Sequence, residues 1–200
     1  MTWGRPARMA WVGVWLACSE GVDAQPITVA GLQRLLQQAP PQRLYFRETH
    51  ESPWLAAPVE SSGSMMSNAT MLEKRVEQPR RETWRILPDR MQLLAADSST
   101  VRELMFNDAP AVAALASALL QVMAADLQAL DKDFRLAPSG DERQWTLQLT
   151  PRHADVARFL KQLELQGAGT QLRLIVILQS QGERTTTRLT AEPWEPHVRP

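Results

Sequence analysis

Two short groups of residues carry the side chains that could do covalent chemistry. Residues 49–52 read Thr-His-Glu-Ser, and His153 precedes Asp155 by two positions. These are the residue types of a serine hydrolase, whose serine needs its base within hydrogen-bond reach. Adjacent residues of a strand point to opposite faces, and the Gly-x-Ser-x-Gly turn of many hydrolases does not occur in the sequence. A hydrolase with Ser52 as nucleophile is therefore the weakest of three hypotheses, and we expect a protein that is not an enzyme.

Metal, cofactor and nucleic-acid sites are not indicated either. The histidines stand at 50, 153 and 197, and Cys18 is the single cysteine, so no pair has the spacing of metal ligands. The "GAG" of residues 167–169 reads as a turn rather than a phosphate loop. The 22 basic residues balance the 22 acidic ones, which argues against nucleic acid as a partner. The basic stretch "KRVEQPRR" alternates with acids and reads as a solvated strand face, or alternatively as a docking surface.

The first 24 residues have the pattern of a secretory signal peptide. Arg5 and Arg8 are followed by the uncharged "MAWVGVWLAC" and by a cleavage-like ending at Ala24. Cleavage there predicts an exported, periplasmic chain that begins at Gln25 and holds no cysteine. The alternatives are an N-terminal membrane anchor or buried segment, or lipidation of Cys18, because "WLAC" weakly matches a lipobox.

The elements that must position any site are mostly strands. A helix is expected within residues 29–39, ended by Pro40 and Pro41. Strands are expected within 42–50, 71–79 and 99–106, a loop joined to a strand within 52–66, two strands around Pro88 and Asp89 within 81–97, and helices over 109–131. Strands within 143–151 and 156–167, and a hairpin over 172–192 that turns near Gly182, complete a domain of residues 25–192. The Pro-rich residues 193–200 are expected to be a loose tail.

This order predicts an α+β fold with an antiparallel sheet, because strands and helices do not alternate. Two helices cannot cover both faces of so broad a sheet. We therefore expect an incomplete antiparallel β-barrel, a half-barrel, curved around a few helices. Its apolar inner side either encloses a cavity or forms an ordinary filled core, and alternation fits both.

The stretch "WTLQLTPR" shows the alternation most clearly, since Trp145, Leu147 and Leu149 share one strand face. The same reasoning gives the full set of candidate cavity residues: Trp84, Ile86, Met91, Leu93, Phe106, Leu119, Phe134, Trp145, Leu147, Leu149, Leu163 and Leu165. Met65, Met66 and Met71 are candidates for an adaptable cavity entrance, or for gap-filling side chains.

Several stretches, taken in order, resemble the LolA-type carriers of outer-membrane lipoproteins. They are "VAGLQRLLQQAP", the glycine of "SSGSMM" (Gly63), "MLEKRVEQPRRETWRILPDRMQLL", "WTLQLTPR", "LKQLELQG" and "LRLIVILQSQGERTTTRL". The resemblance implies a half-barrel closed by helices over an apolar cavity. It also implies a monomeric periplasmic shuttle that shields lipoprotein acyl chains between an inner-membrane donor and an outer-membrane acceptor. Residues 109–131 would then act as a lid.

One departure from the carriers leaves the cargo open. The carriers have an Arg-Pro pair on the strand after the glycine, and the resemblance implies that this Arg helps to hold the lid. Here the corresponding residues are Asn68, Ala69 and Thr70. Lipoprotein acyl chains and another lipid or apolar metabolite are both candidate ligands. The runner-up hypothesis is a membrane-anchored lipoprotein acceptor attached through Cys18.

Overall fold

The computed structural model describes residues 25–39, 43–68, 70–96 and 100–194. The predicted signal peptide with Cys18, and the tail beyond residue 194, lie outside this part of the chain. Within it, no helix has both the length and the apolar character needed to span a membrane.

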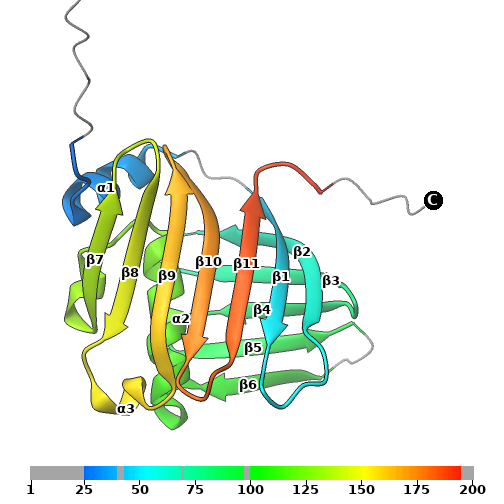
Figure 1. Cartoon of the computed structure of the whole chain (residues 1–200). Coiled ribbons are helices and arrows are strands. Elements are labelled where there is room, and N and C mark those ends of the chain that lie inside the picture. Colours follow the sequence, from blue (N-terminus) through cyan, green and yellow to red (C-terminus); the bar gives the residue numbers. More distant parts are fainter. Residues whose placement is uncertain (1–24, 40–42, 69, 97–99, 195–200) are drawn as a thin grey trace, which may run out of the picture.

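A single antiparallel sheet of 11 strands dominates the described residues (Figure 1). The strand order is β6-β5-β4-β3-β2-β1-β11-β10-β9-β8-β7, so the chain leaves sequence order only where β1 pairs with β11. β6 and β7 are the two edges, and the sheet stays open between them. The predicted incomplete antiparallel barrel is thereby confirmed. The strands are β1 (Leu44–Glu51), β2 (Val59–Ser67), β3 (Leu72–Gln78), β4 (Glu82–Ile86), β5 (Arg90–Ala95), β6 (Val101–Met105), β7 (Phe134–Gly140), β8 (Trp145–Pro151), β9 (Leu160–Ala168), β10 (Gln171–Gln179) and β11 (Arg184–Thr190).

Strand β7 was not among the expected strands, because residues 139–142, which include Gly140, read as a turn. Pro138 of β7 has no backbone N–H to donate to a ladder, but proline is tolerated at the edge of a sheet. β7 is such an edge strand, and its Leu136 pairs with Leu149 of β8.

The helices are few, as expected. α1 (Val29–Gln37) begins at Thr28, whose hydroxyl accepts a hydrogen bond from the Gly31 N–H at 3.1 Å. α2 (Pro110–Met123) has its proline in the first turn. The short elements are η1 (Phe106–Asp108), η2 (Ala129–Lys132) and α3 (Ala154–Ala157).

The expected helical region of 109–131 is shorter in the structure, where α2 ends at Met123. Ala125 has a φ of 53°, in the left-handed region that ends helices. Only the single turn η2 follows. The helical lid expected over 109–131 is therefore α2 followed by an irregular segment.

The core lies between the helices and one face of the sheet, here called the inner face. Buried side chains on this face, such as Phe46, Leu72 and Leu147, cluster with Leu32 of α1 and Val122 of α2. Figure 1 shows α2 lying behind β9 and β10, with β4–β6 running across the view beside it. The opposite, outer face carries Arg47, Glu73 and Arg188, as the strand registers require.

Candidate ligand-binding site

An apolar cleft of about 590 Å³ opens at one end of the sheet. It lies where the end of α1, the start of β1, the end of β2, the end of α2 and the start of β10 meet. Leu36, Leu44, Val122 and Leu172 give it an apolar lining, and Gln37, Ser67, Asn68 and Gln171 contribute polar groups at its rim. Small-molecule sites measure roughly 300–1,000 Å³ and combine an apolar lining with a few polar groups. The cleft has the size and the lining of such a site.

Two glutamines of α1 hold the segment that follows α2. Gln37 Nε2 donates to the Ala125 carbonyl oxygen at 3.3 Å, and Gln33 Oε1 accepts from the Gln128 N–H at 2.9 Å. The two glutamines are four residues apart, so they lie on one side of α1. The wall of the cleft formed by the end of α2 is thus tied to α1 by neutral hydrogen bonds.

Asn68 and Thr70, two of the residues in place of the Arg-Pro pair, are joined by local hydrogen bonds. The Asn68 N–H donates to the Met71 carbonyl at 2.9 Å, and Asn68 Oδ1 accepts from the Thr70 N–H at 2.9 Å. This side chain closes the turn from β2 to β3 at the rim of the cleft. Among the described residues, the side-chain hydrogen bonds to the segment after α2 come from Gln33 and Gln37 of α1, and not from this turn.

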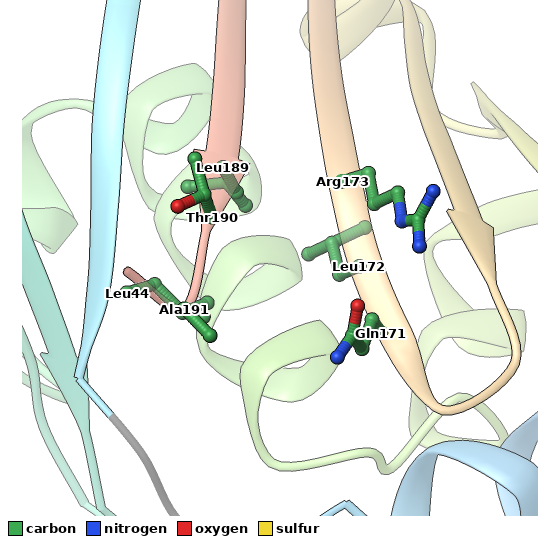
Figure 2. A pocket seen from close by; sticks show the side chains of 7 residues that line it. All are labelled: Leu44, Gln171, Leu172, Arg173, Leu189, Thr190 and Ala191. Atoms are coloured by element: carbon green, nitrogen blue, oxygen red, sulfur yellow. The ribbon is translucent and has the colours of Figure 1, made fainter. Parts of the chain in front are cut away.

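A second, smaller cavity of about 220 Å³ lies where β10 and β11 separate. Their pairing runs from Leu178↔Arg184 to Leu174↔Arg188 and stops there, while β11 stays paired with β1 as far as Thr190. A register shift between Leu172 and Leu174 accompanies the separation. Figure 2 shows Leu172 pointing into the gap between the two strands. Leu44, Gln171 and Leu172 line both this split and the apolar cleft, so the two cavities adjoin.

The structure separates the predicted cavity residues into two groups. One group is packed inside the core with exposed fractions of 2% or less: Phe134, Trp145, Leu147, Leu149, Leu163 and Leu165. The other is half-buried on the inner face of β4 and β5 and on α2: Trp84, Ile86, Met91, Leu93 and Leu119. Phe106 is buried at the start of η1. None of the twelve is among the residues lining the cleft, and their contact with a ligand stays a prediction.

The half-buried group faces an unusual helix. α2 carries no charged residue in its 14 positions, yet only Ala116, Ala118 and Val122 of it are buried. A helix whose only polar side chains are a serine and a glutamine, here Ser117 and Gln121, is normally enclosed. Here its remaining apolar side chains are half-exposed, so apolar surface is left beside the cleft as well as inside it.

The three methionines considered as an entrance do not come together on one surface. Met65 is buried on the inner face, whereas Met66 is 46% exposed and receives a contact from Arg43 Nη2 at 3.3 Å. Neighbouring strand residues point to opposite faces, which separates this pair. Met71 is half-buried in the turn before β3.

A polar group on the inner face was missed from the sequence. Lys74 Nζ lies 2.6 Å from Glu48 Oε1 and 4.7 Å from the centroid of the Phe46 ring. The buried Thr187 donates its hydroxyl to Glu48 Oε2 at 2.7 Å. In the sequence Lys74 alternates with the apolar Leu72 and Val76, and this was the available signal. The two charges neutralise each other at partly buried positions.

The groups considered for catalysis have structural partners. His50 Nδ1 lies 3.0 Å from Thr185 Oγ1, and Ser52 Oγ lies 3.4 Å from Glu183 Oε1. His153 Nε2 lies 3.4 Å from Asp133 Oδ1 at an exposed position. The arrangement pairs Ser52 with an acid and His50 with a threonine, so it does not build a nucleophile with its base. Among residues 25–39, 43–68, 70–96 and 100–194, no cluster could hold a metal ion.

Comparison with known families decides the relationship. The family model for outer membrane lipoprotein carrier protein LolA-like proteins matches residues 16–193. The chain belongs to this LolA-like family. The match begins before the described residues and ends at the residue before Trp194, so it includes every strand of the sheet. A search of curated proteins found no significant match.

Solved structures similar to this LolA-like protein are distant in sequence. One is a LolA superfamily protein from Nitrosomonas europaea, at 10% identity and a TM-score of 0.42, with 82% of this chain and 92% of that chain covered. Another is a proposed outer membrane lipoprotein-sorting protein domain from Vibrio parahaemolyticus, at 7% identity and a TM-score of 0.43, covering 86% and 92%. A third is MucB, at 17% identity and a TM-score of 0.39, covering 86% and 62%. The family assignment rests on the sequence match and not on these similarities.

Proposed function

We propose that this LolA-like protein is a periplasmic carrier that holds an acyl chain in the apolar cleft and moves it between membranes. The observation that supports this most is the cleft itself, about 590 Å³ with Leu36, Leu44 and Leu172 in its wall. The family description, a carrier of outer membrane lipoproteins, supports the same class of ligand. The protein acts by binding and release rather than by catalysis.

Physical chemistry explains why a carrier is needed. Each methylene of an acyl chain that leaves water is stabilised by about 0.8 kcal/mol, so a long chain does not cross an aqueous space unaided at a useful rate. The cleft volume of about 590 Å³ lies within the roughly 300–1,000 Å³ of small-molecule sites. It has room for a long segment of chain. The half-exposed apolar side chains of α2 and of β4–β5 extend the same apolar surface.

Binding requires the wall formed by the end of α2 to move or to be open. We propose that the segment from Ala124 to Gln128, held by Gln33 and Gln37, is the part of the lid that opens. The donor and the acceptor of the chain are proteins or membranes at the two ends of the route. Anchoring of a membrane-bound acceptor through Cys18 is the competing proposal.

Native mass spectrometry of the protein purified from its own periplasm tests this function. A chain that begins at Gln25 and carries the added mass of a lipid or lipoprotein is the expected result. Leu172→Glu places a charge in the cleft wall and should remove the added mass. Leu94→Glu is the matched control, because Leu94 is also half-buried but pairs with Thr83 on the outer face.

Two results would overturn the proposal. A chain that begins at a lipidated Cys18 indicates the anchored acceptor. A folded chain that begins at Gln25, never carries a lipid and does not take one up from vesicles indicates that the cleft is not a binding site.

A further inference from the structure

The split between β10 and β11 is not needed to hold an apolar chain. Its walls are half polar, with Gln171, Arg173 and Thr190 beside Leu172 and Leu189. Its volume, about 220 Å³, is below the range of roughly 300–1,000 Å³ that holds a whole small molecule. It suits a head group of a few atoms better than a complete ligand.

The split is a specific departure from the regular sheet. β10 has its register shift between Leu172 and Leu174, which makes Arg173 the residue without a cross-strand partner on β9. Bulges of this kind re-aim side chains and end pairing, and they occur often beside functional sites. On the other side of the split β11 remains paired with β1, so the gap is bounded by two ordered strands.

Arginines flank the outer mouth of this gap on both sides. Arg173 is exposed on β10, and Arg188 is exposed on β11 where its pairing with β10 ends. Figure 2 shows the Arg173 side chain extending from β10 on the side away from Leu172. It also lines an outer, polar hollow of about 410 Å³ with Gln144, Thr146 and Gln166. Arg173 is also among the residues that line the split, and an exposed arginine changes rotamer within nanoseconds.

Charged residues of both signs lie around the mouth. Arg188 lies directly opposite Arg47 of β1, an arrangement of like charges that costs stability. Arg47 stacks on the Trp194 ring at 4.7 Å. On β9, the acid Glu164 accepts hydrogen bonds from the side-chain amides of Gln148 and Gln166. Glu192, just past β11, has backbone contacts with the Thr190 hydroxyl.

We infer that the split binds the anionic head group of an acylated ligand, a carboxylate or a phosphate, with its chain in the adjoining apolar cleft. This inference rests on the proposed function, because the chain must occupy the cleft. Arg173 and Arg188 contact the head group at the outer mouth. Leu172, which lines both cavities, lies where head group and chain join. The ligand class is thereby narrowed from any apolar chain to an anionic amphiphile.

Isothermal titration with dodecanoate, dodecanol and inorganic phosphate tests the inference. Dodecanoate should bind more tightly than dodecanol, and high salt should reduce this advantage. Arg173→Gln and Arg188→Gln should each weaken dodecanoate binding by up to about fivefold, the scale of an exposed ion pair, and leave dodecanol binding unchanged. Arg173→Lys should restore part of the loss. Arg135→Gln, an exposed arginine on β7, is the control and should change nothing.

Three other outcomes would each refute one part of the proposal. If dodecanoate and dodecanol bind equally and neither arginine variant matters, the head-group site is refuted while the carrier function stands. If neither amphiphile binds, the proposed function fails. If inorganic phosphate alone binds as tightly as dodecanoate, the split is an anion site that is independent of the cleft, and the link to an acyl chain is refuted.

Discussion

Substitutions at Leu147 and Leu172 distinguish the packed core from the proposed ligand cleft. Leu147 has an exposed fraction of 0% and pairs with Pro138 and Leu165 on its two sides. Leu147→Ala leaves a cavity among these side chains and should lower the free energy of unfolding by about 3–5 kcal/mol. In a chain of this length each kcal/mol lowers the melting temperature by about 2–4 °C, so a fall of about 10 °C is expected.

Leu172→Ala should behave differently, because Leu172 is half-buried in the cleft wall. Full burial of a leucine stabilises by about 1.5–3 kcal/mol, so half of it corresponds to about 1 kcal/mol and a fall of about 3 °C. The same loss of apolar contact should weaken binding of dodecanoate about fivefold. Leu147→Ala should leave that affinity within about twofold of wild type.

The assay combines calorimetric melting with titration of dodecanoate at a temperature where circular dichroism shows both variants folded. The reasoning is refuted if Leu147→Ala melts near the wild-type temperature but loses dodecanoate binding. Leu147 would then line the ligand cavity, as its alternation in the sequence suggested. The cleft beside Leu172 would be the wrong site.

Two further predictions concern the sheet. Gly63→Ala places a methyl group against the backbone carbonyl oxygen of Arg75 at the β2–β3 register shift. It should lower the free energy of unfolding, measured by chemical denaturation, by more than about 2 kcal/mol. Ser62→Ala is the control and should lower it little. Burial raises the pKa of Glu73, but hydrogen bonds from Arg85 and Arg75 at 2.9 and 2.6 Å outweigh it, so the pKa lies below its ordinary value of 4.5. A depressed pKa gives stability that is present above pH 4.5 and is lost as the pH falls through the folded value. Glu73→Gln should therefore lower stability by about 1–2 kcal/mol at neutral pH, and this difference should disappear in acid denaturation below the folded pKa; an equal difference at every pH would refute it.

Most of the sheet could be predicted because its strands are locally encoded. Alternation placed Trp84 beside Ile86 and Leu147 beside Leu149 on common faces, and these faces are the ones that meet the helices. The absence of strand–helix alternation gave the antiparallel connectivity. Apart from β7 and the short helical turns, the order of the elements follows from signals that lie within a few residues of each other.

The cleft could not be predicted in the same way. Leu36, Leu44, Val122 and Leu172 come from four elements, and nothing local shows that their ends meet. The separation of β10 from β11 depends on a register shift, which changes pairing without changing the apolar pattern. β7 was missed because residues 139–142 read as a turn, and its Pro138 is acceptable only at a sheet edge, which is a property of the whole fold.

In this chain the glutamines of α1, and not an arginine on the strand after Gly63, hold the segment that follows α2. Asn68 uses its side chain to close its own turn, so the wall of the cleft is held by Gln33 and Gln37 through hydrogen bonds to Gln128 and Ala125. Neutral hydrogen bonds contribute about 0.5–1.5 kcal/mol each, so breaking both costs about 1–3 kcal/mol. Burial of only four methylenes of a ligand offsets that cost, at about 0.8 kcal/mol each. A wall held in this way opens for any sufficiently long chain, so discrimination between ligands must come from another part of the site. In our proposal, the arginines at the split between β10 and β11 supply this discrimination.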